Sequence, residues 1–253
     1  TQRSTLFPYT TLFRSSRGLR VHLHATGRVR EGLRELLPRL DSLTVSLDGD
    51  PGVNDAIRGT GAFDAALWAI RAARSAGIPV ANTAVLSRSS LPGLPGFLEW
   101  LRRERLATLF QPASPVRLRG DRACPEEQPD PADLRRAIAL LARARREGVP
   151  VRNSPAGLDY LSDWPEPRPL QCAGGRWFVR VGADGALGIC GLPGDPSPPG
   201  IDARDGVVRG MRRLAAAGNG CDRCRSAARA ELMLALRLQP TAITGMLSRA
   251  GGR

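Results

Sequence analysis

Short apolar runs, typical of strands, alternate along the chain with segments whose apolar residues follow the helical period. This pattern predicts repeated strand–helix units. Short runs rich in leucine and β-branched residues predict strands at 19–25, 43–49, 78–86 and 107–113. Segments with one apolar stripe predict helices at 30–40, 63–76, 94–105 and 133–147. Because strands and helices alternate with short connections, we expect an α/β fold with a parallel sheet or part of a βα barrel. In such folds the chemistry lies at the carboxyl ends of the strands.

The pattern changes after residue 165. The proline-rich stretch 165–171 predicts a boundary between a barrel-like domain at 16–165 and a second domain at 166–253. The second part begins with a predicted hairpin at 176–190, whose strands flank a turn containing Asp184 and Gly185. A loop at 191–206, a helix at 207–216 and further apolar helices follow. We therefore expect a small α+β domain at the carboxyl end.

The first fifteen residues differ from the rest of the chain. The stretch TLFPYTTLFRS at 5–15 holds two of the six phenylalanines and one of the two tyrosines. It matches the in-frame translation of a common sequencing adapter, so we expect residues 1–15 to be an artefact and exclude them from fold reasoning. On this interpretation native sequence begins near Ser16, and an amino-terminal part of the protein is missing.

The chain is strongly basic, with a formal net charge of +13 and no lysine among its 37 basic residues. Such a charge raises the question of nucleic-acid binding. The arginines are spread along the predicted helices, however, and aromatic residues for base stacking make up only 5% of the chain. Nothing in the sequence reaches the length of a membrane span. We expect a cytoplasmic protein that binds neither nucleic acid nor a membrane.

The cysteines are the most informative residues. Cys124 stands alone in a polar loop, and we expect it to be incidental. Cys172 and Cys190 bracket the predicted hairpin, while Cys221 and Cys224 form a Cys-x-x-Cys pair before an apolar helix. Four such thiolates suit an iron–sulfur cluster or a structural zinc ion, and a disulfide is the third use.

Several stretches resemble the radical S-adenosylmethionine (radical SAM) enzymes. The segment 43–80 has a strand ending in Ser-Leu-Asp-Gly, an Asp-x-Ile-Arg-Gly stretch, a Phe-led helix and Gly-Ile-x-Val. The turn Ala-Thr-Gly at 25–27 resembles the family's Thr-Asn-Gly turn, and the cysteine set resembles the twitch form of the SPASM auxiliary-cluster domain. The resemblance covers about 19–240 and favours a [4Fe–4S] cluster on Cys172, Cys190, Cys221 and Cys224.

The resemblance also implies cofactor contacts. Ser46 and Arg58 are the candidates for the amino-acid part of S-adenosylmethionine, Asn82 for its ribose, and Gln111 lies at an equivalent strand end. Asp48 belongs to the same group, although fixing the turn is its favoured role. His22 and His24 share one face of a strand, but no carboxylate is evident to complete a metal site with them.

One departure from the family decides what this chain is expected to do. The sequence contains no Cys-x-x-x-Cys-x-x-Cys loop, which in the family binds the catalytic cluster. The parent enzyme is expected to use S-adenosylmethionine and a second [4Fe–4S] cluster to abstract a hydrogen atom from a small-molecule or peptide substrate, with an external electron donor. The chain itself is expected to be an inactive fragment. A zinc-stabilised module without catalysis and, less favoured, an arginine-rich nucleic-acid binder are the alternatives.

Overall fold

The computed structural model describes residues 18–113, 125–190, 197–218 and 220–244. The adapter-like segment 1–15 and Cys124 therefore lie outside the described residues. Among the described residues, four strands form one sheet in the order β1-β2-β3-β4, namely His22–His24, Ser42–Ser46, Val80–Leu86 and Thr108–Pro112. All neighbouring strands of this sheet are parallel. The expected α/β fold with a parallel sheet is confirmed.

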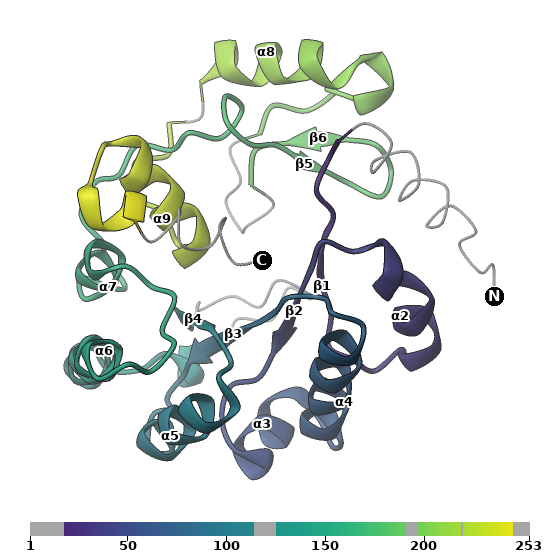
Figure 1. Cartoon of the computed structure of the whole chain (residues 1–253). Coiled ribbons are helices and arrows are strands. Elements are labelled where there is room, and N and C mark those ends of the chain that lie inside the picture. The colour runs from purple at the N-terminus through teal and green to yellow at the C-terminus, as the bar shows by residue number, and fades with distance from the viewer. Residues whose placement is uncertain (1–17, 114–124, 191–196, 219, 245–253) are drawn as a thin grey trace.

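The helices between and directly after the strands lie in an arc around one side of the sheet (Figure 1). They are α2 (Arg30–Leu36), α3 (Pro51–Arg58), α4 (Ala62–Ser75), α5 (Leu94–Glu104), α6 (Pro131–Arg146) and α7 (Pro155–Leu161). Leu43 and Val45 of β2 and the following Leu47 are fully buried against this helical layer, together with Ile70 and Leu101. Burial of this apolar surface is the main driving force that holds helices and sheet together.

Local capping explains where the helices begin. The carboxylate of Asp50 accepts a hydrogen bond from the backbone N–H of Val53, and Ser154 caps the N–H of Gly157 in the same way. Each cap is followed by proline at the first helical position, which favours a helix start. α3 and α7 are therefore well specified locally, although the apolar pattern did not predict them because both are short.

One glycine has a packing role in the Ala-Thr-Gly turn. Gly27 has a φ of +78°, and a Cβ added there would lie 2.1 Å from the carbonyl oxygen of Ala65 in α4. Only glycine permits both this backbone conformation and this close approach. The turn after β1 is thereby packed directly against a helix of the outer layer.

The carboxyl-terminal part lies on the other side of the sheet (Figure 1). It contains the antiparallel pair β5 (Arg180–Val181) and β6 (Leu187–Gly188), then α8 (Val207–Ala217) and α9 (Ala227–Leu236). Leu187, Ile189, Ile201 and Leu214 form a small hydrophobic cluster under the hairpin. Residues of α9, including Ala230 and Met233, instead belong to the large core that contains the sheet.

Candidate functional site

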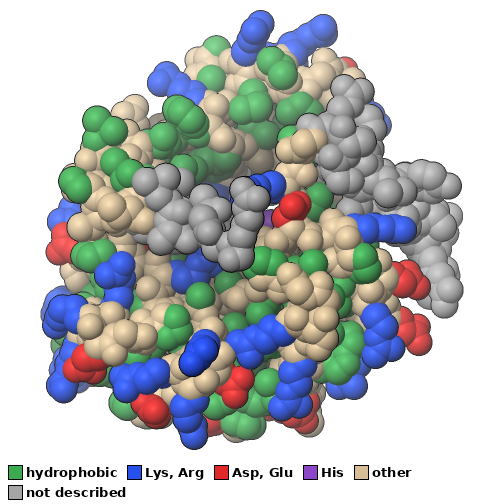
Figure 2. Space-filling view, viewed as in Figure 1, with side chains coloured by type: hydrophobic (Ala, Val, Ile, Leu, Met, Phe, Trp, Pro, Cys, Tyr) green, Lys and Arg blue, Asp and Glu red, His purple; other side chains and the backbone are tan. Residues whose placement is uncertain are grey.

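The sheet has one face that is not covered by the helical layer, and we call it the inner face. Along β2 the buried Leu43 and Val45 point to the helices, so Ser42, Thr44 and Ser46 point the other way. The strand register extends this face across the sheet. Its polar and charged members are His22, His24, Ser42, Thr44, Ser46, Thr83, Gln111 and Arg152. Figure 2 shows a histidine side chain, with basic and acidic side chains beside it, next to a hollow of the molecule.

His22 and His24 form a fixed pair at one edge of the inner face. Their ring centroids are 4.9 Å apart in an edge-to-face arrangement. The His22 ring also hydrogen-bonds to the hydroxyls of Ser42 and, at 2.8 Å, of Thr44. Burial lowers the pKa of His22 to about 4, with further lowering from the charges of His24 and Arg152. Burial and Arg152 also lower the pKa of His24, so both rings are uncharged at neutral pH.

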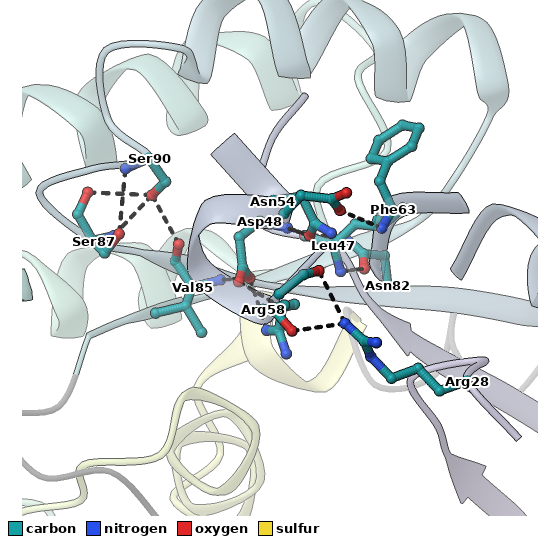
Figure 3. A network of polar contacts seen from close by, with 12 residues as sticks. Arg28, Leu47, Asp48, Asn54, Arg58, Phe63, Asn82, Val85, Ser87 and Ser90 are labelled. Carbon is teal, nitrogen blue, oxygen red and sulfur yellow. Dashed lines mark hydrogen bonds and ion pairs between the residues drawn. The ribbon is translucent and has the colours of Figure 1, made fainter. Parts of the chain in front are cut away.

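The Ser-Leu-Asp-Gly and Asp-x-Ile-Arg-Gly stretches meet in an internal ion pair (Figure 3). Arg58 donates from Nε and Nη2 to the two carboxylate oxygens of Asp48, at 2.7 and 3.0 Å. The Asp48 side chain is fully buried and also accepts the backbone N–H of Val85 at 2.8 Å. Arg58 was a candidate for binding the carboxylate of the cofactor. In the structure its guanidinium binds the carboxylate of Asp48 instead. The Asp48 carboxylate thereby joins the end of β2 to α3 and to β3.

Asn82 of β3 is fully buried, and its side-chain amide binds the backbone of Leu47, the residue that follows β2. Its Oδ1 accepts the N–H of Leu47 at 2.8 Å, while its Nδ2 donates to the carbonyl of the same residue at 3.0 Å. Asn153 binds both backbone groups of Phe110 in the same manner. The side chain of Asn82, the candidate for the ribose, has no exposed surface in the structure. Ser46 is half-buried on the inner face.

Gln111 connects the end of β4 to the start of α9. Its amide nitrogen donates to the carbonyl of Arg225 at 3.1 Å, and its oxygen accepts the N–H of Ala227 at 2.5 Å. Gln111 was a candidate for the cofactor, and the structure places its amide against the segment that follows Cys224. This contact holds the Cys-x-x-Cys segment at the carboxyl end of the sheet.

The four carboxyl-terminal cysteines lie close enough for the charge of one thiolate to act on the pKa of others. The N–H of Cys172 donates to the carbonyl of Cys221 at 3.0 Å, which joins the start of the hairpin segment to the Cys-x-x-Cys turn. Burial raises the pKa of the Cys172 thiol, and Cys221 and Cys190 raise it further. Burial also raises the pKa of Cys224, to about 12, with contributions from Cys172 and Cys190. Ionisation of one thiol therefore opposes ionisation of the others.

The environment of the thiols contains donors to sulfur. The N–H of Gly174 donates to Sγ of Cys172 at 3.3 Å. Arg229 of α9 donates to Sγ and to the carbonyl of Cys190, at 2.6 and 2.8 Å, and its guanidinium lies 5.3 Å from the centre of the Phe178 ring. Within the described ranges, no group of three or more His, Cys, Asp or Glu is spaced to hold a single metal ion.

Two buried residues that the sequence did not single out connect α7 to the carboxyl-terminal segment. The hydroxyl of Tyr160 in α7 accepts the N–H of Cys224 at 2.8 Å and contacts its carbonyl at 3.1 Å. Burial raises the pKa of Tyr160 to about 12, so the phenol stays protonated. Glu231 of α9 is buried and accepts the N–H of Ser154 at the start of α7. The only sequence signal that could have found these two residues is a polar side chain at a position where an apolar helical stripe predicts an apolar one.

Comparison with known proteins gives a structural likeness and no sequence match. No protein-family model matches the chain, and no curated protein does. A structure of anSMEcpe with bound AdoMet has a TM-score of 0.60 at 13% identity, over 94% of this chain and 78% of that one. A structure of anSMEcpe with AdoMet and the Cp18Cys peptide has a TM-score of 0.60 at 14% identity, over 95% and 82%.

No helix in the part of the chain that the structure describes is both long enough and apolar enough to cross a membrane. The matched structures are of a radical SAM enzyme. At these identities the likeness shows the fold alone, and it agrees with the parallel sheet and its outer helices. The chain therefore has an α/β fold of the radical SAM type.

Proposed function

We propose that this chain is part of a radical SAM enzyme and that it carries one auxiliary [4Fe–4S] cluster on Cys172, Cys190, Cys221 and Cys224. The observation that carries the proposal is the hydrogen bond that joins Cys172 to the Cys-x-x-Cys turn, which Gln111 holds beside the carboxyl end of the sheet. The effect of the thiols on one another's pKa supports it. The part of the chain from 166 onward then acts as an auxiliary domain of the SPASM/twitch kind. It is joined to β4 through Gln111 and to α7 through Tyr160 and Glu231.

The residues present fit such a cluster. Four thiolates complete the ligand shell of a [4Fe–4S] cluster, and hydrogen bonds to the sulfurs together with nearby charge set its reduction potential. Gly174 and Arg229 supply the hydrogen bonds to Cys172 and Cys190. Each thiolate of a [4Fe–4S] cluster binds a different iron atom, so the sulfurs need not surround a single point as they do around zinc. When bound, the cluster supplies one-electron transfer.

The proposed reaction is hydrogen abstraction from a peptide or metabolite, driven by S-adenosylmethionine. The structures of anSMEcpe contain AdoMet and, in one case, a peptide, which supports a peptide as the substrate class. Ser46 and Thr83 on the inner face are the described residues that offer hydroxyls to a bound molecule there. The printed sequence has no Cys-x-x-x-Cys-x-x-Cys loop. We infer that the cluster that cleaves the cofactor needs residues outside this sequence, and that the chain alone is inactive.

Anaerobic reconstitution with ferrous iron and sulfide tests the cluster. We expect a brown product with about four iron and four sulfide per chain. Cys221→Ser should lose most of the iron, whereas Cys124→Ser, the same change at the cysteine outside the set, should retain it. A colourless protein with one zinc per chain would refute the iron–sulfur cluster and support the zinc-stabilised alternative. Production of 5′-deoxyadenosine from S-adenosylmethionine by the chain alone would refute the inferred inactivity.

A further inference from the structure

A basic helix lies at the outer edge of the carboxyl-terminal part. Figure 1 shows α8 at this edge, and Figure 2 shows basic side chains projecting there. α8 carries Arg209, Arg212 and Arg213, and all three are exposed. Among the α-helices that the structure describes, α8 alone contains no aspartate or glutamate. Its arginines therefore lack a partner on their own helix of the kind that Glu99 provides for Arg102 in α5.

Two glycines bring α8 close to the hairpin. A Cβ added at Gly210 of α8 would lie 2.2 Å from Cδ1 of Leu187 in β6. A Cβ added at Gly175 would lie 3.1 Å from backbone atoms of Leu214 and Ala215 in α8. Leu214 is fully buried in the small hydrophobic cluster under the hairpin. The backbone of α8 thus packs directly on the segment that follows Cys172.

The same segment contacts the thiol of Cys172. The N–H of Gly174 donates to Sγ of Cys172 at 3.3 Å, and the next residue, Gly175, is the one that contacts α8. Cys172 and Cys190 also pack against the hydrophobic cluster to which Leu214 belongs. Successive residues of one turn therefore contact the first cysteine of the proposed cluster and the inner side of the basic helix.

An exposed aromatic side chain completes this surface. The N–H of Trp177 donates to the carbonyl of Ala173 at 3.0 Å, which closes a turn next to Cys172, and the Trp177 side chain is 66% exposed. Tryptophan and arginine are among the residues that contribute most to protein–protein binding. We call this surface the α8 face, and it consists of Arg176, Trp177, Val208, Arg209, Arg212 and Arg213, all of them exposed.

We propose that an acidic electron-transfer protein docks on the α8 face. This inference rests on the proposed function, because the partner exchanges an electron with the four-cysteine cluster. The reduced cluster, [4Fe–4S]⁺, loses one electron and returns to [4Fe–4S]²⁺, while a one-electron centre of the partner gains it. No bond forms or breaks, and no proton moves. Electron transfer slows steeply with distance, so the partner docks where the cluster is thinly covered. The unbalanced arginines select an acidic surface and guide its approach.

Binding of a defined acidic protein tests the docking surface. The probe is oxidised plant-type [2Fe–2S] ferredoxin, and cytochrome c, a basic one-electron protein, is the control. Dissociation constants are measured with the full chain by biolayer interferometry at increasing sodium chloride, before and after reconstitution of the cluster. We expect ferredoxin to bind with an affinity that falls with salt, and cytochrome c to bind much more weakly.

Variants separate the α8 face from the overall positive charge of the chain. Arg212→Glu combined with Arg213→Glu should weaken ferredoxin binding by about tenfold or more. Arg135→Glu combined with Arg136→Glu, at exposed positions of α6, makes the same change in net charge and should leave the affinity within about twofold. The milder Arg212→Gln with Arg213→Gln should give a smaller loss in the same direction. Circular dichroism verifies that each variant is folded.

The reconstituted chain gives a second readout. The rate of electron exchange between cluster and ferredoxin, followed by stopped-flow absorbance, should fall in the α8 variants in the same order as the affinity. Binding needs no iron, so the two proposals fail separately. A colourless chain whose ferredoxin binding depends on α8 would refute the cluster and support the docking surface.

Several outcomes would overturn the docking surface. They are an equal loss of affinity in the α6 and α8 variants, a folded α8 variant that binds ferredoxin as the parent does, cytochrome c binding as tightly as ferredoxin, and no binding of ferredoxin at all. Duplex DNA that binds more tightly than ferredoxin at the same salt, and is lost in the α8 variant, would assign the face to nucleic acid.

Discussion

The hydroxyl of Tyr160 provides a sharp test of how the Cys-x-x-Cys turn is held. Tyr160 is fully buried, and its hydroxyl contacts both the N–H and the carbonyl of Cys224. Tyr160→Phe removes the hydroxyl and keeps the ring, so packing changes little. The buried N–H of Cys224 then loses its partner. A buried polar group without a partner costs about 1–3 kcal/mol, and the cavity left by one oxygen adds little.

We therefore expect Tyr160→Phe to lower the free energy of unfolding by about 2–3 kcal/mol. For a chain of this size that corresponds to a fall in Tm of roughly 4–12 °C. The measurement is urea denaturation followed by circular dichroism, with thermal unfolding as a second readout. Trp177→Phe is the control, because this aromatic side chain is 66% exposed.

The reconstituted protein gives a second readout of the same change. If the hydroxyl positions Cys224, the variant should lose iron to a chelator faster than the parent protein does. A loss of stability below about 0.5 kcal/mol, which is within the range of ordinary surface substitutions, would refute the reasoning. It would mean that water or a shifted backbone replaces the hydroxyl at no cost.

Three further predictions concern other contacts. Arg58→Gln leaves the fully buried Asp48 carboxylate without its counterion and should lower the free energy of unfolding by about 3 kcal/mol. Arg102→Gln, at an exposed ion pair, should lower it by less than about 1 kcal/mol, and equal urea midpoints for the two variants would contradict this. The pKa of His22 is about 4 when folded and 6.5 when unfolded, so its contribution to stability is present above pH 6.5 and is lost as the pH falls toward 4. The groups that face it are His24, Arg152 and the hydroxyls of Ser42 and Thr44, and His22→Gln should flatten the fall in urea midpoint over this range. Arg229→Gln removes a positive charge beside Cys190 and should lower the reduction potential of the reconstituted cluster in a redox titration monitored by EPR; an unchanged potential would mean that the guanidinium does not act on the cluster.

The sequence by itself determined the strand–helix order of the sheet. Apolar runs gave the positions of all four strands of the sheet, and one-sided apolar stripes gave α4, α5 and α6 to within about two residues at each end. α3 and α7 were missed because a helix of one or two turns is too short to show a period. Their Asp50-Pro51 and Ser154-Pro155 starts were the signal that could have found them.

The tertiary structure decided which partners several candidate side chains bind. Arg58, Asn82 and Gln111 have donors that suit a cofactor, and nothing in the sequence shows that Asp48, Leu47 and Arg225 already accept them. The same holds for His22, whose pKa is lowered in part by the charge of Arg152, 130 residues away along the chain. Residue type and spacing along the chain limit what a side chain can bind. What it does bind depends on neighbours that are distant in sequence, since burial and hydrogen-bond partners are properties of the folded chain.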